Sequence, residues 1–336
     1  MPANLTPQYL AAEQRYKDAV TVQEKIEALE EMMAVIPKHK GTEKLRADLR
    51  RRLAKLRKES GRKHGMSRAS AMYSVQREGA GQVVLVGGAN AGKSSLLACL
   101  TNASPEIGDY PFTTRLPQPG MMPYENIKIQ LVDMPSIDPN FYQPWMSSVV
   151  RQADLILLIA DLGTDALLEQ VEGVLALLNT SRIRLVKKSD PSEESGTDIL
   201  RQALLVANKM DAPGALSRLN ILSEFFGQAF DIMTISAATG EGTEDLRHRV
   251  FQDLNIIRVY TKVPGKKADL TSPPYVMKYG STVMDAARTV HRGFVQSLKY
   301  AKVWSSGTPN HSLKYSGQMV ERTHVLEDGD ILELHI

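Results

Sequence analysis

A glycine-rich loop constrains the fold of this chain more than any other segment. Residues 87–95, GGANAGKSS, fit the pattern G-x-x-x-x-G-K-[ST], with the apolar run QVVLV before them and the helical run SSLLACL at their end. In such a strand–loop–helix unit, consecutive backbone N–H groups point into the loop and the helix N-terminus adds positive partial charge. The sequence therefore predicts a polyphosphate-binding loop after the first strand of an α/β domain.

Between residues 82 and 256, short apolar runs alternate with helical patterns. The runs are QVVLV, IKIQLV, LILLIA, ALLVA and DIMTI, and they are nearly continuous, as in strands covered on both faces. This rhythm predicts an α/β fold with a mainly parallel sheet and helices on both faces. A polar stretch between Asn179 and Leu200 interrupts the rhythm, and we expect a surface loop there.

The two ends of the chain differ in character from this middle part. Apolar residues at helical spacing predict two helices between Ala11 and about Glu59, broken near residues 37–41, that pair as an antiparallel hairpin. From residue 257 onward, strand-like and helical runs fit a small α+β domain. We therefore expect three domains: a basic helical region at 1–80, the phosphate-binding domain at 81–256 and the small domain at 257–336.

Composition and charge limit where the protein is located and what it binds. The chain has 336 residues, a lone cysteine, Cys99, and no N-terminal run typical of a signal peptide, so we expect a cytoplasmic location. Its longest strongly apolar stretch, residues 155–160, is too short to span a bilayer, so we expect no membrane partner. The formal net charge is only +3, yet basic residues concentrate between Lys38 and Arg68. This segment is either a solvated helix face or a contact for nucleic-acid phosphates.

Three residues are expected to act on phosphate and metal. Lys93 would reach the β- and γ-phosphates of a nucleotide, and the Ser94 hydroxyl would ligate Mg²⁺. Asp133 ends the IKIQLV run, where a carboxylate holds Mg²⁺ directly or through a water. An isolated Asp at a strand end is weak support, but its position after the glycine-rich loop favours the assignment.

A second motif indicates which base is recognised. Asn208-Lys209-Met210-Asp211 follows the ALLVA run and fits N-K-x-D, the signature of GTPases. A carboxylate accepts hydrogen bonds from guanine N1–H and the N2 amino group, whereas adenine offers no such pair. Asn208 would brace the loop, and the Lys209 stem would lie over the base. Ser236-Ala237-Ala238 matches the short loop whose backbone contacts guanine O6.

A third segment, Asp109-Tyr110-Pro111-Phe112-Thr113-Thr114, lies where a GTPase places its first switch. A threonine there closes on Mg²⁺ and the γ-phosphate in the triphosphate state and is released after hydrolysis. We expect Thr114 to take this role, with Thr113 as the alternative, because spacing alone does not decide between them. Lys93 and Thr114 are thus the candidate catalytic residues.

These motifs together define a candidate site for GTP and GDP. The candidate nucleotide-binding residues are Gly87, Gly88, Ala89, Asn90, Ala91, Gly92, Lys93, Ser94, Ser95, Asp133, Asn208, Lys209, Asp211, Ser236, Ala237 and Ala238. The candidate Mg²⁺ ligands are Ser94, Thr114 and Asp133.

The order GxxxxGKS, YPFTT, DMP, NKMD and SAA resembles the Obg-like branch of translation-factor-type GTPases. The ends of the chain resemble those of developmentally regulated GTP-binding (DRG) proteins. Residues 26–59 look like the helical segment before the G domain, and residues 256–336 resemble a TGS domain, a β-grasp module shared with threonyl-tRNA synthetase. The resemblance implies a P-loop GTPase with an N-terminal helical hairpin, associated with ribosomes or RNA. Its TGS domain would contact either RNA or a protein partner, and the sequence does not decide between them.

Three positions bear on how fast GTP would be hydrolysed. Ser136 replaces the Gly of DxPG, and Ile137 stands where Ras-like enzymes keep a Gln that orients the attacking water. We therefore expect slow intrinsic hydrolysis. Asn90 matches the position at which some relatives hold K⁺, which makes K⁺ a second candidate cofactor. Two functions remain open: a GTP-hydrolysing switch, or an RNA- or ribosome-binding module that holds GTP with negligible turnover.

Overall fold

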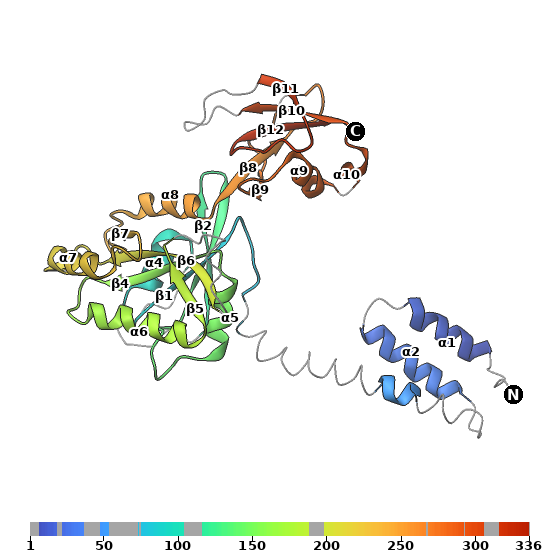
Figure 1. The fold of residues 1–336 in the computed structure, drawn as a ribbon, viewed down its shortest axis with the longest axis horizontal. Coiled ribbons are helices and arrows are strands. Elements are labelled where there is room, and N and C mark those ends of the chain that lie inside the picture. The colour runs from blue at the N-terminus through green and yellow to red at the C-terminus, as the bar shows by residue number, and fades with distance from the viewer. Residues whose placement is uncertain are drawn as a thin grey trace. The chain divides into compact units, whose positions relative to one another are not determined.

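The computed structural model describes residues 7–18, 22–36, 48–53, 73, 75–103, 116–187, 198–266, 268–291, 293–305 and 316–335. The chain divides into two compact units, Met1–Ser74 and Val75–Ile336. Figure 1 traces the elements of both units in chain order. Among the described residues, no helix has the length and apolar character needed to cross a membrane.

In the first unit, α1 (Pro7–Asp18) and α2 (Val22–Val35) contact each other, and both lie before the expected break at residues 37–41. Their pairing is therefore not the expected hairpin, whose second helix falls after that break. Residues 48–53 form a further stretch of helix. The segment of the first expected helix is thus described as two helices, Pro7–Asp18 and Val22–Val35. The unit has its own core, formed by Tyr9, Ala12, Leu29, Met32, Ile36, Leu49 and Leu53.

A mainly parallel sheet forms the centre of the second unit. Its strands are β1 (Gln82–Gly87), β2 (Gln118–Tyr124), β3 (Ile127–Asp133), β4 (Leu155–Asp161), β5 (Ile183–Val186), β6 (Ile199–Asn208) and β7 (Ile232–Thr234). The strand order is β2-β3-β1-β4-β6-β5, and β7 pairs with β6. Only the β2–β3 pair is antiparallel among the described strand pairs of this sheet. The predicted fold class is confirmed.

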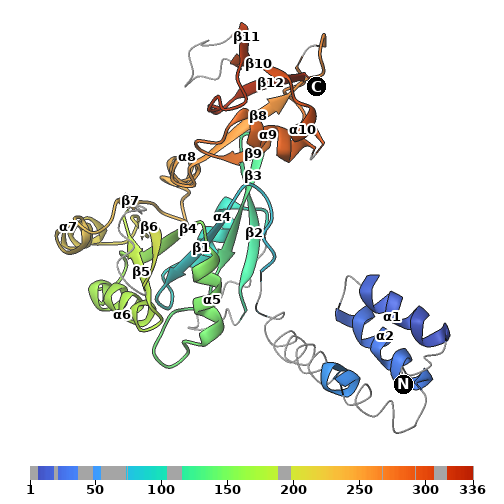
Figure 2. The ribbon, with the colours of Figure 1, turned by 45° about the vertical axis from the view of Figure 1, so that its right-hand side comes forward.

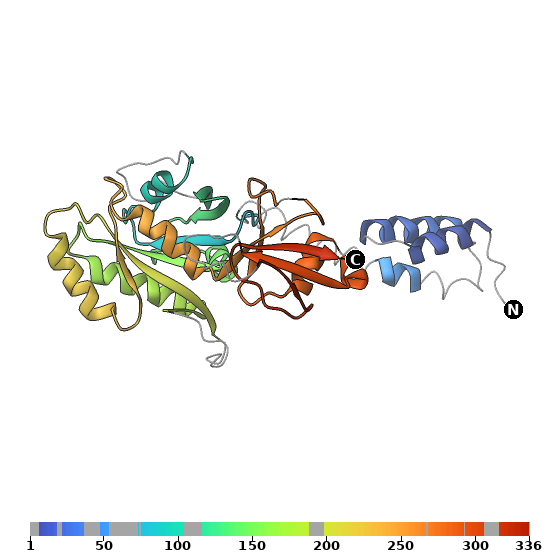
Figure 3. The same cartoon turned by 90° about the horizontal axis from the view of Figure 1, so that it is seen from above.

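Helices cover both faces of this sheet. They are α4 (Lys93–Leu100), α5 (Pro144–Gln152), α6 (Leu167–Thr180), α7 (Ala215–Phe226) and α8 (Thr243–Asp253). Alternate residues of each central strand enter two separate cores, one with α5, α6 and α7 and the other with α4 and α8. Viewed from above, the sheet separates α4, in teal, from α6, in green (Figure 3). The carboxyl edge of the sheet is thus held between two packed layers.

Two strands depart from the sequence expectations. The polar stretch between Asn179 and Leu200, expected to be a surface loop, contains β5 and the start of β6, which pair in parallel. Ile183 and Leu185 are buried and the residue between them is exposed, so this strand carries the alternating pattern of an edge rather than a continuous apolar run. The loop expectation was therefore wrong for residues 183–186. Strand β2 was not expected at all, because its sequence QPGMMPY contains two prolines.

The carboxyl-terminal part of the second unit forms a separate five-stranded sheet. Its strands are β8 (Ile256–Thr261), β9 (Tyr275–Lys278), β10 (Tyr300–Ser305), β11 (Ser316–Val320) and β12 (Asp330–His335), in the order β11-β10-β12-β8-β9. The same domain contains helices α9 (Val283–Val290) and α10 (Phe294–Ser297). Helix α9 lies against this sheet (Figure 1), and its Val283, Ala286 and Ala287 share a core with Ile257, Val259 and Leu332 of the strands. The arrangement fits the β-grasp fold implied by the resemblance.

Candidate functional site

The glycine-rich loop joins β1 to α4 as the motif predicts. Strand β1 ends at Gly87, and α4 begins at Lys93 after Gly92, whose φ is +88°. A Cβ atom at Gly92 would lie 2.3 Å from Nδ2 of Asn208, so both the backbone angle and the space require glycine. The loop is therefore held closely against the end of β6.

Lys93 lies inside this loop rather than in solvent. Its side chain donates hydrogen bonds from Nζ to the carbonyl oxygens of Gly87 (3.2 Å) and Gly88 (2.8 Å) and to Oγ of Ser136 (3.4 Å). Burial lowers the pKa of the ammonium group to about 8, although the nearby Asp133 carboxylate acts in the opposite direction. A bound polyphosphate would bring negative charge to this ammonium and favour its charged form.

Two oxygen groups meet beside the loop. The Ser94 hydroxyl donates a hydrogen bond to Oδ2 of Asp133 at 2.5 Å, and Asp133 is fully buried at the end of β3. A hydroxyl and a carboxylate that converge beside phosphate oxygens are the ligand types that Mg²⁺ prefers. The donor set therefore fits Mg²⁺.

Asn208 ties the phosphate loop to the base-recognition loops. Its Nδ2 donates to the carbonyl oxygen of Ala91 (3.0 Å), and its Oδ1 accepts from the backbone N–H of Ala237 (3.0 Å). The residue is 1% exposed, so these two bonds are shielded from water. One side chain thus fixes the spacing between the two ends of the candidate nucleotide site.

The Asp211 carboxylate is oriented by a neighbour. Oγ of Ser236, a fully buried residue, donates to Oδ1 of Asp211 at 2.6 Å and accepts from the backbone N–H of Thr239 at 3.1 Å. This brings together two motifs that are 25 residues apart in the sequence. A carboxylate held in one orientation is suited to accept the paired hydrogen bonds that guanine offers.

One residue of this site was missed by the sequence analysis. Asp161 ends β4, accepts from Nζ of Lys209 at 2.7 Å, and accepts from the backbone N–H of Gly163 at 2.7 Å. It therefore holds the Lys209 side chain, which the sequence places over the base. The signal was present in LILLIAD, because this carboxylate follows an apolar strand as Asp133 does.

The residues that depart from GTPase motifs occupy different environments. Ile137 is 3% exposed, contributes to the core shared with α5, α6 and α7, and donates its backbone N–H to the Gly87 carbonyl at 3.1 Å. Ser136 contacts Lys93, as described above. Asn90 is exposed on the loop with a φ of +58°. The side chain at 137 is thus an apolar core residue that offers no hydrogen bond to water.

Other predicted residues lie on the same loops or outside the described part of the chain. Gly88 and Ala91 are buried, Ala89 and Ser95 are half-buried, and Ala238 is exposed beside Ala237. Thr113 and Thr114, with the rest of residues 109–114, lie outside the described residues.

The predicted groups converge at one edge of the sheet. Strands β1, β3, β4 and β6 end at Gly87, Asp133, Asp161 and Asn208, and these four ends are adjacent because the strands pair in parallel register. Open parallel sheets bind ligands at the carboxyl ends of their strands. The predicted phosphate loop, the predicted cation ligands Ser94 and Asp133, and the Asp211 carboxylate predicted to bind the base thus follow strands that end at the same edge.

Family comparisons agree with this geometry. Residues 82–188 match the family described as 50S ribosome-binding GTPase, and residues 257–336 match the TGS domain. The first match covers the phosphate loop and Asp133, and the second covers nearly the whole of the β-grasp sheet.

Three relatives align along nearly the whole chain. A GTP-binding protein of Methanocaldococcus jannaschii is 31% identical, with 95% of this chain and 94% of the relative covered. Ribosome-interacting GTPase 1 of Saccharomyces cerevisiae is 28% identical, with 94% and 99% covered. Developmentally-regulated GTP-binding protein 1 of Xenopus laevis is also 28% identical, with 92% and 98% covered. The chain belongs to the developmentally regulated GTP-binding (DRG) family of GTP-binding proteins, with a P-loop GTPase domain and a C-terminal TGS domain.

Proposed function

We propose that this protein hydrolyses GTP to GDP and phosphate and acts as a molecular switch on the ribosome or another RNA. The observation that carries the proposal is the Asn208 side chain, which bonds Ala91 of the phosphate loop and Ala237 of the base loop. This brace sets a fixed distance between a phosphate site and a guanine site. A protein that only stores an anion would need no such link between the two loops.

Each residue has a defined task in this proposal. Lys93 binds the β- and γ-phosphates and neutralises charge that develops between them. Ser94 and Asp133 hold Mg²⁺, which supplies positive charge to the phosphate oxygens when it is bound. Thr114 closes on the γ-phosphate, Lys209 covers the base, and Asp211 accepts the guanine N1–H and N2 hydrogens.

Hydrolysis is expected to be slow without a partner, because the buried Ile137 offers no hydrogen bond to water. The test is phosphate release from GTP by the purified protein, alone and with ribosomes, beside a Lys93→Ala variant as background. We expect a rate above that background, and a further rise of about tenfold or more with ribosomes. A wild-type rate equal to background under both conditions would contradict hydrolysis.

That negative result would favour the second candidate function, an RNA- or ribosome-binding module that holds GTP with negligible turnover. This alternative is supported by the side chains at two positions, Ser136 and Ile137. Neither side chain supplies the water-orienting amide of Ras-like enzymes. GTP affinity would then remain high while phosphate release stays absent.

K⁺ is proposed as an activating ion at Asn90, because this residue is exposed on the phosphate loop. A cation there would offset charge on the transferred phosphate. We expect hydrolysis to be at least about tenfold faster in KCl than in NaCl at equal ionic strength. Asn90→Ala is expected to remove the difference between the two salts. Equal wild-type rates in the two salts would exclude this role.

The N-terminal basic segment is proposed to contact RNA phosphates. Leu49 and Leu53 face the core of the first unit, and Arg50, Arg51 and Arg52 are exposed. Family and relative names that refer to ribosomes support an RNA partner, and such a partner would place the protein in the cytoplasm. We accordingly assign RNA binding to residues 1–80 and the nucleotide cycle to residues 81–256. Residues 257–336 are proposed to contact either RNA or a further protein partner.

Reversing the three arginine charges, with Arg50→Glu, Arg51→Glu and Arg52→Glu together, is expected to weaken ribosome association about tenfold or more. The dependence of affinity on salt should also become shallower, by about one unit of log–log slope for each lost phosphate contact. Cosedimentation with ribosomes across a salt series measures both quantities. Arg184→Glu, which reverses an exposed charge on β5, is the control and should change neither. An unchanged affinity in the triple variant would contradict the RNA-contact assignment.

A further inference from the structure

The β2–β3 hairpin reaches from the candidate nucleotide site to the C-terminal β-grasp domain. Its pairing runs unbroken from Gln118 opposite Asp133 at one end to Tyr124 opposite Ile127 at the other. At about 3.4 Å per residue, the ribbon is roughly 20 Å long. Figures 1 and 2 both show its far end beside the beginning of the second sheet. Asp133, the candidate Mg²⁺ ligand, thus belongs to a ribbon whose other end meets another domain.

Arg258 of β8 forms hydrogen bonds to the far end of the hairpin, at Glu125 and Asn126. Its side chain is 6% exposed and binds Asp328 of its own domain through two bonds, Nε to Oδ1 (3.0 Å) and Nη2 to Oδ2 (2.7 Å). The remaining nitrogen, Nη1, bonds the Glu125 carboxylate and Oδ1 of Asn126, the latter at 3.3 Å. Because Asp328 fixes the guanidinium plane, Nη1 is presented to the hairpin in one orientation.

Two other pairs of residues join the hairpin to its neighbours beside Arg258. Asn126 donates from Nδ2 to the hydroxyl of Tyr260 in β8. The ring of Tyr124 stacks on Phe251 of α8 at a centroid distance of 4.8 Å, and Arg258 lies 5.0 Å from the same Phe251 ring. Helix α8 leads into β8, so hairpin, helix and C-terminal sheet meet at one point.

The residue at the hairpin turn is unusual for its backbone conformation. Glu125 has a φ of +47°, in the left-handed region that glycine or asparagine occupies at lower cost. Its carboxylate makes the ion pair with Arg258. The backbone conformation of the turn favours glycine or asparagine at position 125, whereas the contact with Arg258 favours a carboxylate. The residue present, Glu125, is the one that makes the contact.

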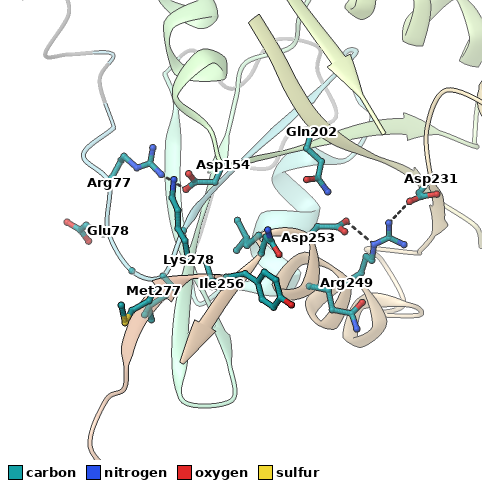
Figure 4. Close-up of a pocket in the computed structure, with 18 of the residues that line it drawn as sticks. Arg77, Glu78, Asp154, Gln202, Asp231, Arg249, Asp253, Ile256, Met277 and Lys278 are labelled. Carbon is teal, nitrogen blue, oxygen red and sulfur yellow. Dashed lines mark hydrogen bonds and ion pairs between the residues drawn. The ribbon is translucent and has the colours of Figure 1, made fainter. Parts of the chain in front are cut away.

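The other side of the same junction is open. A cavity of about 750 Å³ lies between segment 77–81, the end of α8 and β9 (Figure 4). Arg77, Asp154, Arg249 and Lys278 line it with charged side chains, among which Arg77 pairs with Asp154. The cavity lies beside the α8–β8 connection, because Leu254, Asn255 and Ile256 also line it.

We propose that the hairpin and Arg258 couple the nucleotide state to the position of the C-terminal domain, with Glu125 and Asn126 as positioning residues for the nucleotide site. When Mg²⁺ is bound, Ser94 and Asp133 would hold it in place of their mutual hydrogen bond, and a shift of Asp133 would move one end of the hairpin. The paired strands carry that movement to Glu125, and Arg258 carries it to β8. This inference rests on the proposed GTP cycle.

Thermodynamic linkage supplies the test. If the contact at Glu125 is made differently in the GDP and GTP states, removing it must change the ratio of the two affinities. Glu125→Gly is the informative variant, because glycine suits the left-handed turn and leaves the hairpin at least as favourable while the ion pair is lost. Glu125→Gln keeps an oxygen acceptor for Arg258 and should restore part of the wild-type ratio. Asp198→Ala removes an arginine-paired carboxylate at the opposite edge of the sheet and is the matched control.

The measurement is the dissociation constant of the full-length protein for GDP and for a non-hydrolysable GTP analogue. We expect Glu125→Gly to shift the ratio of the two constants at least about fivefold from wild type, with no shift in Asp198→Ala. If wild type binds both nucleotides and the ratio in Glu125→Gly is unchanged, the coupling is wrong while the GTP site stands. If wild type binds neither nucleotide, the proposed function fails and this inference fails with it.

Discussion

Asp211→Asn is expected to lower the affinity for GTP by about 100-fold or more, because two hydrogen bonds from guanine to a charged acceptor are lost. The variant should fold normally. The Ser236 hydroxyl, which donates to Oδ1 of Asp211 at 2.6 Å, can donate equally to the amide oxygen of Asn. The amide nitrogen would then point toward the base and meet the guanine N2 amino group, donor against donor. Equilibrium binding of GTP by calorimetry measures the loss.

The same substitution offers an internal control. Xanthosine triphosphate carries a carbonyl oxygen in place of the guanine N2 amino group, so an amide nitrogen at 211 would have an acceptor. We expect Asp211→Asn to bind xanthosine triphosphate better than wild type does, which separates altered specificity from a damaged fold. Equal GTP affinity in wild type and variant would show that Asp211 does not read the base.

Lys93→Ala is expected to lower the rate of GTP hydrolysis by about 10²- to 10³-fold, the effect of removing one preorganised charge from a phosphoryl-transfer site. Without nucleotide, the variant should be no less stable than wild type. Burial lowers the pKa of Lys93 to about 8, below its value in the unfolded chain, so the charged form disfavours folding at neutral pH. The free energy of unfolding of the wild-type protein therefore increases as the pH rises from the folded-state pKa of Lys93 toward its higher unfolded-state pKa. Lys93→Ala should lack that increase.

Two measurements check this pair of effects. Single-turnover phosphate release gives the catalytic loss, and thermal unfolding of the nucleotide-free protein at pH 7 and pH 9 gives the stability effect. Lys266→Ala, which removes an exposed lysine of the C-terminal domain, is the control for both. Hydrolysis by Lys93→Ala within a few-fold of wild type would contradict the role given to this ammonium group.

The sequence predicted the strands of the sheet where burial made their pattern unambiguous. Strands β1, β3 and β4 are buried nearly throughout, since helices cover both of their faces. Strand β2 escaped prediction because Pro119 and Pro123 argue against a strand. The structure places β2 at the edge of the sheet, where a residue without a backbone N–H donor is tolerated.

The candidate site was predictable to the extent that its residues belong to short motifs. Lys93, Ser94 and Asn208 each sit in a pattern of fixed spacing, and the structure brings their loops together. Asp161 has only the weak signal of a carboxylate at the end of an apolar strand, and the contact with Lys209 in the structure gives it a role. Arg258 is more remote still, because its partner Glu125 is 133 residues earlier in the chain. Contacts between residues so far apart leave no local signature that one sequence can reveal.

The measurement that tests the switch most directly is ribosome association in the two nucleotide states. The full-length protein is loaded with GDP or with a non-hydrolysable GTP analogue and sedimented with ribosomes at about physiological ionic strength. A switch requires the two states to differ in affinity by the coupling free energy, so we expect at least about a fivefold difference. Equal association of the two forms, with both nucleotides shown to be bound, would contradict the account.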